Sequence, residues 1–240
     1  MINELTIIFP LFNEEKRLKK TFSEIQNFKK KVRKKKIEII FVDDGSQDKS
    51  KSLLDSFIHK VSSKKFNIKY IKLRKNMGKG FALKVGIKKS SLKWILTTDI
   101  DLSVPLSQIL DWEKNNYLKE KKVIFGSRNH QRSKVNKNFL RYILGKFFNF
   151  FVNTILCISL LDTQCGFKLY KSSIAKKIYS KLTNYGFTHD LELVLILNQK
   201  KIEIIELPVK WSHKSGSKVN IFLDSIKMFL NIIFLRFKYF

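Results

Sequence analysis

The sequence is poor in cysteine, proline and glycine, with 2, 3 and 9 of these residues among 240. The two cysteines, Cys157 and Cys165, do not form a C-x₂-C pair, which excludes a common zinc-site spacing and favours a reduced, intracellular protein. No stretch offers about 18 uninterrupted apolar residues, so no segment is typical of a membrane-spanning helix. An apolar run begins already at Leu5, so we expect no cleavable signal peptide before it.

Acidic residues are also scarce, since 20 Asp and Glu stand against 48 Lys and Arg, for a formal net charge of +28. Such an excess indicates a polyanionic partner, either an anionic membrane surface or nucleic acid. No nucleic-acid-binding module is recognisable, so we expect no nucleic-acid partner, and a basic nucleic-acid-binding protein is kept as the alternative of another class. Hydrophobic residues at 44% indicate a folded chain with room for one large domain.

Short apolar runs recur through the first half and are separated by segments with helical spacing. Leu18, Phe22, Ile25 and Phe28, for example, fall on one helical face. Each run ends in acidic or glycine-rich residues, and we expect Pro10 to stop the first. This alternation predicts an α/β fold with a doubly wound, mostly parallel sheet and flanking helices. The predicted strands are Leu5–Phe9, Ile37–Val42, Ile68–Leu73 and the run that starts at Trp94.

The fourth run passes through two threonines into Asp99-Ile100-Asp101. Ligands of such sheets bind beyond the carboxyl ends of the strands, where these two carboxylates fall. Alternating residues of a strand point to opposite faces, so a turn must redirect one carboxylate if both serve one ion. Hard oxygen ligands of this kind suit Mg²⁺ or Mn²⁺, although a bare D-x-D is also typical of a solvated turn.

The segment Asn76-Met77-Gly78-Lys79-Gly80 opens a predicted helix. Its glycines allow close backbone approach, and the free N–H groups of a helix N-terminus can hold a phosphate. The segment lacks the Lys-Ser/Thr of a P-loop and the G-x-G-x-x-G of a dinucleotide site. The ligand class therefore stays open from this segment alone.

Four motifs, taken together in their order and spacing, resemble family 2 glycosyltransferases with the GT-A fold. They are Pro10 with Asn13-Glu14, Asp43-Asp44-Gly45-Ser46, Asn76 with Gly78-Lys79-Gly80, and Asp99-Ile100-Asp101. The resemblance implies that the first three motifs bind the nucleotide sugar, through Pro10, Asn13, Glu14, Asp43, Asp44 and Lys79, together with Asp99. It also implies that Asp99 and Asp101 carry Mg²⁺ or Mn²⁺ on the diphosphate.

Further motifs in the second half resemble the dolichyl- and polyprenyl-phosphate glycosyltransferases, and Asp162–Lys168 is most similar to the glucosyl branch. The others are Val123–Arg128, His189–Leu193, Leu207–Trp211 and Gly216–Val219. The resemblance runs from about Thr6 to Val219. One departure is Ser103, because mannosyl-transferring relatives have glutamine there, and serine is a poorer metal ligand.

The resemblance implies a metal-dependent, inverting transfer of a hexose, most simply glucose from UDP-glucose, to a polyprenyl phosphate. A mannosyl or modified-sugar transferase to the same lipid is the alternative. Asp101, Asp190 and Arg128 are the implied catalytic residues, and Arg128, Lys168 and Lys218 the implied contacts of the acceptor phosphate. A phosphate monoester has a second pKa of about 6, so we expect Asp190 to orient the acceptor rather than deprotonate it.

Two apolar segments bear on location. Charged and amide residues interrupt both 139–161 and 219–240, so both are typical of helices that lie in a membrane interface. The alternatives are a buried core helix for 139–161 and packing against the catalytic domain for 219–240. In 219–240 we expect Met228, Phe229 and Ile232 on the membrane side. We therefore predict a catalytic domain over 1–218, an amphipathic helix over 219–240, and association with the cytoplasmic face of an anionic membrane.

Overall fold

The computed structural model describes residues 2–118, 122–136, 149–186, 188–214 and 221–240, with the side chains of 221–226 left out. The prediction for Lys218 and that for the first part of 139–161 lie outside these residues.

A seven-stranded sheet forms the centre of the molecule, in the strand order β3-β2-β1-β4-β7-β5-β8. All neighbouring strands are parallel except β7, which runs antiparallel to both β4 and β5. The predicted mostly parallel α/β sheet is therefore confirmed. The strands are β1 (Glu4–Leu11), β2 (Lys36–Asp43), β3 (Phe66–Lys72), β4 (Trp94–Thr97), β5 (Val123–Ser127), β7 (Lys168–Lys171) and β8 (Ile205–Pro208).

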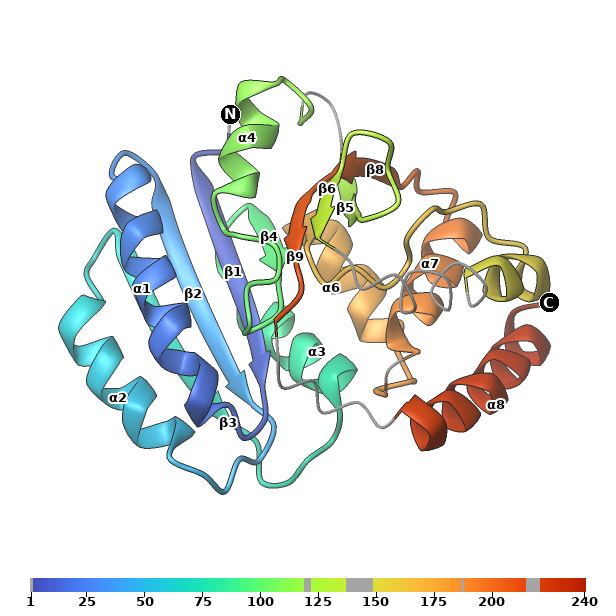
Figure 1. The fold of residues 1–240 in the computed structure, drawn as a ribbon, viewed down its shortest axis with the longest axis horizontal. Coiled ribbons are helices and arrows are strands. Elements are labelled where there is room, and N and C mark those ends of the chain that lie inside the picture. Colours follow the sequence, from blue (N-terminus) through green and yellow to red (C-terminus); the bar gives the residue numbers. More distant parts are fainter. Residues whose placement is uncertain (1, 119–121, 137–148, 187, 215–220) are drawn as a thin grey trace.

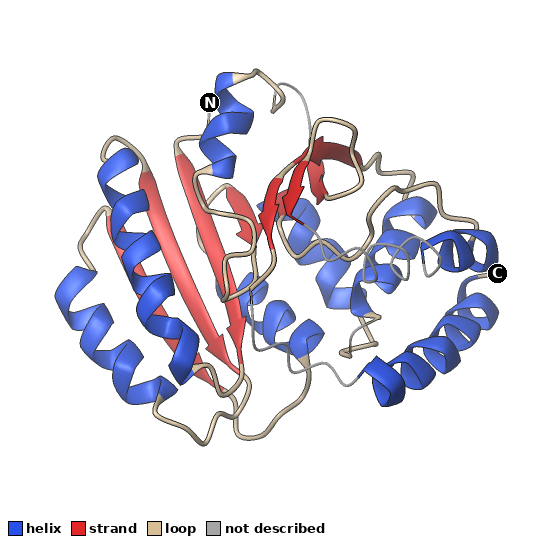
Figure 2. Cartoon of the chain, in the orientation of Figure 1, coloured by secondary structure: helices blue, strands red, loops and turns tan. Residues whose placement is uncertain are grey.

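Helices cover both faces of this sheet (Figures 1 and 2). One layer consists of α1 (Glu15–Lys31), α2 (Ser50–Val61) and α4 (Gln108–Lys114). The other consists of α3 (Lys79–Lys89), α6 (Ser172–Lys181), α7 (His189–Gln199) and part of α8 (Ile221–Tyr239). A second, two-stranded sheet pairs β6 (Lys134–Asn136) with β9 (Lys210–Ser212), which the sequence did not predict.

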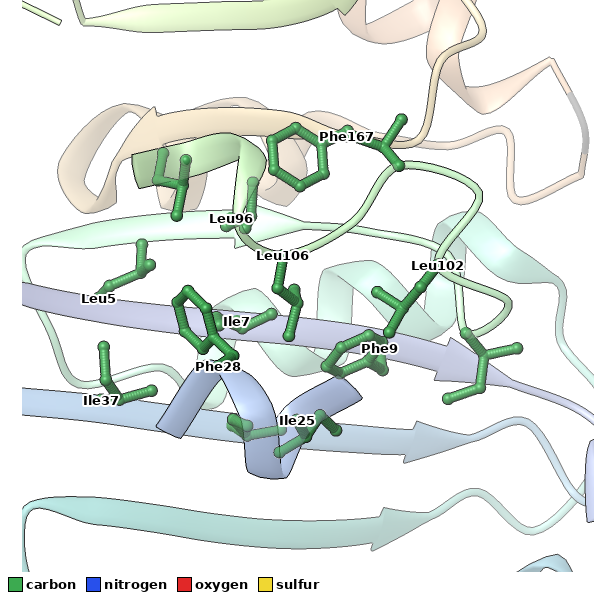
Figure 3. Close-up of a cluster of buried hydrophobic side chains, with 14 of the residues drawn as sticks. Leu5, Ile7, Phe9, Ile25, Phe28, Ile37, Leu96, Leu102, Leu106 and Phe167 are labelled. Carbon is green, nitrogen blue, oxygen red and sulfur yellow. The ribbon is translucent and has the colours of Figure 1, made fainter. Parts of the chain in front are cut away.

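The apolar face predicted for the first helix is what holds α1 to the sheet. Ile25 and Phe28 lie over Ile7 and Phe9 of β1 in Figure 3. Leu102, which follows the D-x-D segment, reaches the same cluster and is 6% exposed. This anchoring fixes the chain on the carboxyl side of Asp101, so the turn that carries the aspartates is built on the core.

The prediction that Pro10 stops the first strand is wrong, because β1 continues through Pro10 to Leu11. Pro10 pairs in register with Val42 of β2. The Ile8 carbonyl accepts the Thr98 N–H at 3.2 Å, so Ile8 and Pro10 point their backbone polar groups to the β4 side. Strand β4 ends at Thr97, so the N–H that proline lacks has no strand partner to lose there.

Helix α8 packs one side on the domain and leaves another exposed. Ile232 and Leu235 are fully buried in the core that contains α3, α6 and α7. The predicted orientation of this helix is therefore wrong at Ile232, which was expected on the membrane side. Apolar residues occur nearly all round the helix, so their spacing alone does not identify the packed face. Within the described ranges, none of the helices combines the length and the apolar composition that a membrane span requires.

Candidate active site

A cleft of about 620 Å³ opens at the carboxyl ends of β1, β2 and β4. Residues from both ends of the chain line it, because Lys227, Met228 and Asn231 of α8 join those of the first half. From the predicted nucleotide-sugar residues it receives Pro10, Glu14, Asp44, Lys79 and Asp99, and it also receives the predicted metal ligand Asp101. The structure therefore brings most of the motifs of the first half to one place.

The turn after β4 directs both aspartates of the D-x-D segment into this cleft. Leu102 adopts a left-handed backbone with φ of 49°, and the Ser103 N–H donates to the Asp101 carboxylate at 2.9 Å. These two features reverse the chain beyond Asp101. Asp99 and Asp101 consequently line the same cavity although they alternate in sequence. The hypothesis that both carboxylates serve one metal ion requires this arrangement.

The backbone of Gly166 lies against the Asp99 carboxylate. A Cβ atom at this position would sit 2.3 Å from an Asp99 carboxylate oxygen, so no other residue fits without moving it. The Thr97 hydroxyl donates to the Gly166 carbonyl at 3.1 Å and holds the two segments together. The glycine of the Asp162–Lys168 motif thus leaves the space that the Asp99 side chain occupies, although the two residues are far apart in the sequence.

Lys79, the first residue of α3, forms an ion pair with Asp99 at 2.6 Å. Burial opposes the charge of Lys79, but Asp99, with Asp190 and Asp101 nearby, raises the pKa of the ammonium group well above its usual value. The side chain therefore remains a cation at the mouth of the D-x-D turn. Such a cation offsets the charge of the two aspartates and suits an anionic ligand in the same cleft.

The glycine segment before α3 is engaged with the protein itself. The Asp44 carboxylate accepts the N–H groups of Met77 and Gly78, each at 2.8 Å, and the Gly80 N–H donates to the Tyr185 carbonyl at 2.9 Å. Burial is the main reason that the pKa of Asp44 is raised. Close backbone approach is confirmed here, but it is the loop at Tyr185 that approaches. The interpretation of these N–H groups as free phosphate donors is wrong at Met77, Gly78 and Gly80.

The loops after β1 and β2 are bound to one another. The Asn13 N–H donates to the Ser46 hydroxyl at 2.8 Å, and the Glu14 N–H donates to the Ser50 hydroxyl at 2.9 Å. Asn13 has a left-handed backbone with φ of 53°, which asparagine tolerates well. The structure thus places Asn13 beside Glu14 at the edge of the cleft and gives it a role in shaping the loop.

Asp43, predicted to bind the nucleotide, is fully buried. Its carboxylate accepts the Ser46 N–H at 2.7 Å and the Tyr70 hydroxyl at 2.5 Å. Burial and the adjacent Asp43 carboxylate raise the pKa of Tyr70 above its usual value, so the phenol remains a donor. Asp43 therefore holds the turn that presents Asp44, and it is not among the residues that line the cleft.

Arg128 follows β5 and forms a bidentate pair with the buried Asp162. Its Nε and Nη2 donate to the two carboxylate oxygens at 2.6 and 2.8 Å, and its backbone N–H donates at 2.9 Å. Burial opposes the ionised Asp162 carboxyl, but Arg128 lowers its pKa below the usual value. A small cavity of about 40 Å³ joins Arg128 to Asp99 and Trp211, so this guanidinium group lies next to the main cleft.

Lys168 is the first residue of β7, and its ammonium group is buried rather than presented at a turn. It pairs with the Asp190 carboxylate and donates to the Thr163 carbonyl at 2.9 Å. Burial works to raise the pKa of Asp190, but His189, Lys168 and Lys79 outweigh it and lower this pKa to about 2. Burial also lowers the pKa of His189, although the adjacent Asp190 carboxylate opposes this. Within the described chain, neither Lys168 nor Asp190 lines the cleft.

Several cleft residues carry no signal that sequence analysis could have used. Lys227, Met228 and Asn231 come from α8, and their contact with the cleft depends on how this helix docks. Trp211 lies in a segment that the resemblance does cover, but without an assigned role. The further side chains that line the cleft are those of Leu11, Phe12, Arg17, Asn76, Ala82, Ile100, Ser103, His213 and Lys214.

Asp99 and Asp101 are the carboxylates of this cleft suited to a divalent cation. Across the described ranges, no group of three or more His, Cys, Asp and Glu side chains is arranged to hold a metal ion. Two carboxylates can still bind Mg²⁺ or Mn²⁺ when phosphate oxygens of a ligand and water fill the remaining positions. The chemistry of the donor set therefore fits a metal that is shared with a phosphorylated ligand.

Sequence comparison places the chain among known proteins. Residues 6–179 match the protein family described as Glycosyl transferase family 2. The dolichyl-phosphate beta-glucosyltransferase of Dictyostelium discoideum is 35% identical over 245 residues, covering 98% of this chain and 74% of that protein. The protein of the same name from Homo sapiens is 32% identical over 247 residues, covering 98% and 76%.

Solved structures with little sequence identity share the fold. Glucosyl-3-phosphoglycerate synthase from Mycobacterium tuberculosis, solved with Mn²⁺, UDP and glucosyl-3-phosphoglycerate, superimposes with a TM-score of 0.64 at 14% identity, over 98% of this chain and 80% of that one. S. aureus TarS 1–349 gives a TM-score of 0.60 at 15% identity, over 97% of this chain and 64% of that one.

Proposed function

Because the chain belongs to glycosyltransferase family 2, we propose that this glycosyltransferase moves glucose from UDP-glucose to a dolichyl-type polyprenyl phosphate. The observation that carries the proposal is the convergence of Asp99, Asp101 and Lys79 in one cleft with the loops after β1 and β2. The names of the relatives support the sugar and the acceptor, since proteins 30–35% identical over nearly the whole chain are dolichyl-phosphate beta-glucosyltransferases.

The donor is proposed to lie along the cleft with its diphosphate at the D-x-D turn. Glu14 and Asp44 border the part of the cleft nearest β1 and β2, where the nucleoside would lie, and Asp43 and Asn13 shape their loops. Asp99 and Asp101 would hold Mg²⁺ or Mn²⁺ on the diphosphate, and that ion would offset charge on the leaving group. Lys79 adds a fixed cation next to Asp99.

The acceptor phosphate is proposed to approach from the side of Arg128. Asp162 holds this guanidinium group, which lines the small cavity together with Asp99, and this proximity supports the proposal. Lys168 is too deeply buried to be the first choice for a phosphate contact, and we propose that it fixes Asp190 instead. Lys218 stays a prediction from the sequence.

Asp190 is proposed to orient Lys168 and not to act as a strong base. A group with a pKa of about 2 is a weak proton acceptor at neutral pH. The acceptor phosphate, with a second pKa of about 6, is already largely dianionic and needs no deprotonation to attack the anomeric carbon. Asp190 then keeps Lys168 in place and adds negative potential near Lys79.

The direct test is a transfer assay with purified protein, polyprenyl phosphate and Mn²⁺, in which UDP-glucose, GDP-mannose and other nucleotide sugars are compared. We expect a glucosyl lipid, identified by mass, from UDP-glucose, and far less product from GDP-mannose. Preferred use of GDP-mannose would replace the glucosyl assignment with the mannosyl alternative. Absence of a lipid product with every donor would contradict the proposal that a polyprenyl phosphate is the acceptor.

The exposed side of α8 is proposed to rest on the cytoplasmic face of an anionic membrane. Five large apolar residues on this side are between 45% and 84% exposed, and the Phe151 ring stacks on Phe229 at 5.5 Å from the neighbouring helical segment 149–156. These five residues, which we call the aromatic face, are Phe229, Leu230, Phe234, Phe237 and Phe240. Contiguous exposed aromatics beside cations, in a chain of net charge +28, are typical of an interfacial surface.

Replacing Phe234 and Phe237 with serine should weaken liposome binding at least ten-fold, because each large apolar side chain contributes about 1.5–3 kcal/mol when it leaves water. Co-sedimentation with anionic vesicles measures the effect, and raising the salt concentration should weaken the remaining binding. Turnover of a short, water-soluble acceptor phosphate should be retained in the same variant. Unchanged vesicle binding would contradict the assignment of the aromatic face.

A further inference from the structure

Glu192 is a buried carboxylate of α7 that lies outside the cleft and joins two elements distant in sequence. Its side chain is fully buried. It accepts the N–H groups of Thr183 and Asn184 at 3.0 and 2.6 Å and the Thr183 hydroxyl at 2.7 Å. From α8 it accepts the Lys238 ammonium group at 2.7 Å and the Tyr239 hydroxyl at 2.9 Å.

The carboxylate is ionised in this setting. Burial works to raise its pKa, but the hydrogen bonds from Lys238, Asn184 and Thr183 outweigh burial and leave the pKa below the usual value. A buried anion with five donors is held firmly, and each donor is held by it in return. Loss of the two donors from α8 would leave the charge of Glu192 without its cation.

The loop held by Glu192 supports the donor side of the cleft. The Tyr185 carbonyl of this loop accepts the Gly80 N–H at 2.9 Å. A Cβ atom at Gly78 would lie 2.4 Å from the same carbonyl oxygen, so the loop packs directly on the start of α3. The Tyr185 ring packs edge-on against Phe81 at 5.0 Å. Lys79, between these two glycines, is the residue that pairs with Asp99.

Helix α8 also contacts the cleft itself, through its earlier turns. Lys227, Met228 and Asn231 line the cleft, while Lys238 and Tyr239 bind Glu192 about two to three turns later. The same helix carries the aromatic face on its exposed side. One rigid element therefore touches the cleft, the loop that supports Lys79, and the proposed membrane.

We propose that Glu192 is a positioning residue that couples the docking of α8 to the affinity of the donor site. With α8 docked, Glu192 fixes loop 183–186, and this loop fixes Lys79 against Asp99. With α8 displaced, the loop loses its anchor and the donor site loosens. The inference rests on the proposed donor, a uridine nucleotide, but its structural step is independent of the sugar and of the acceptor.

The test removes the contacts from the α8 side, which leaves α7 and its core residues unaltered. In Lys238→Met, UDP binding measured by calorimetry should weaken about ten-fold, the loss expected from one charge-assisted hydrogen bond. Amide hydrogen exchange at Thr183 and Asn184 should accelerate. The KM for the nucleotide sugar should rise more than the KM for the lipid phosphate.

Arg236→Ala is the matched control, because Arg236 is a cation on the same helix whose described contacts are the Phe240 ring and the Cys157 Sγ, at 3.5 Å, and not Glu192. It should leave UDP affinity and exchange at 183–184 unchanged. Glu192→Gln should reproduce the effects of Lys238→Met. The neutral glutamine side chain has no charge to pair with Lys238, and its NH₂ group would face N–H donors.

Wild-type UDP affinity and wild-type exchange in Lys238→Met would overturn the inference while leaving the proposed function intact. Equal weakening in Arg236→Ala would also overturn it, because the effect would then belong to helix stability in general. Failure of the wild-type protein to bind UDP would overturn the proposed donor and this inference together.

Discussion

Replacing Asp101 with alanine should lower glucosyl transfer by about 10²–10³-fold, the range seen when one electrostatic contact to developing charge is lost. The carboxylate lies in the cleft, and the only hydrogen bond described for it is local, from the Ser103 N–H. Loss of that bond should cost about 1 kcal/mol of unfolding free energy, so the protein should remain folded. Initial rates with UDP-glucose and polyprenyl phosphate, combined with thermal unfolding, measure both effects.

Asp111→Ala is a suitable control, because Asp111 is a surface carboxylate that pairs with Lys210 at 2.8 Å. It should retain both activity and stability. EDTA should abolish transfer by the wild-type enzyme, and added Mn²⁺ should restore it. Transfer at the wild-type rate in Asp101→Ala, or in EDTA, would remove Asp101 from the proposed metal site.

Replacing Lys168 with alanine should lower the free energy of unfolding by about 3–5 kcal/mol, since it strands the buried Asp190 carboxylate without its cation. The pair is closed from solvent, with exposed fractions of 1% and 7% for the two side chains. Urea or guanidinium unfolding measures the loss. The reverse variant, Asp190→Ala, should be destabilised to a similar extent, and activity should fall with it.

A surface pair provides the control for this prediction. Lys210→Ala breaks the exposed pair with Asp111 and should change stability by less than about 1 kcal/mol. Lys168→Met with Asp190→Leu should recover much of the stability, because two apolar side chains replace two opposite charges. A stable Lys168→Ala protein that had lost only its affinity for the acceptor would restore the phosphate role expected from the sequence.

The framework of the fold was predictable from the sequence because short apolar runs identify the strands without reference to distant residues. Apolar runs such as Ile37–Val42 are buried strands with polar ends, and strand ends meet at one edge of a parallel sheet. That rule alone predicts that Asp44, Lys79 and Asp99 lie close together. The four motifs of the resemblance fall in this same region, where the structure forms the cleft.

What sequence analysis missed depends on contacts between distant segments. The burial of Lys168 against Asp190 follows from β7 entering the sheet between β4 and β5, and no local pattern in the sequence encodes this. The packed side of α8 is another case, since Ile232 and Phe234 are equally apolar and only docking separates them. The N–H groups at Gly78 and Gly80 looked free because their partners are 34 and 105 residues away, at Asp44 and Tyr185.

The antiparallel strand β7 also has a consequence for how the protein folds. Strand β4 pairs with β1 on one side, and in the described part of the chain Lys168–Lys171 cover its other edge. A nascent or refolding chain that has formed β1 to β4 therefore exposes the row of unpaired N–H and C=O groups on β4 until β7 arrives. Such late, long-range pairing slows folding and leaves an edge open to association with other chains. Gly166 reaches Asp99 through the same segment, so the turn that carries Asp99 and Asp101 acquires its final shape only in this late step.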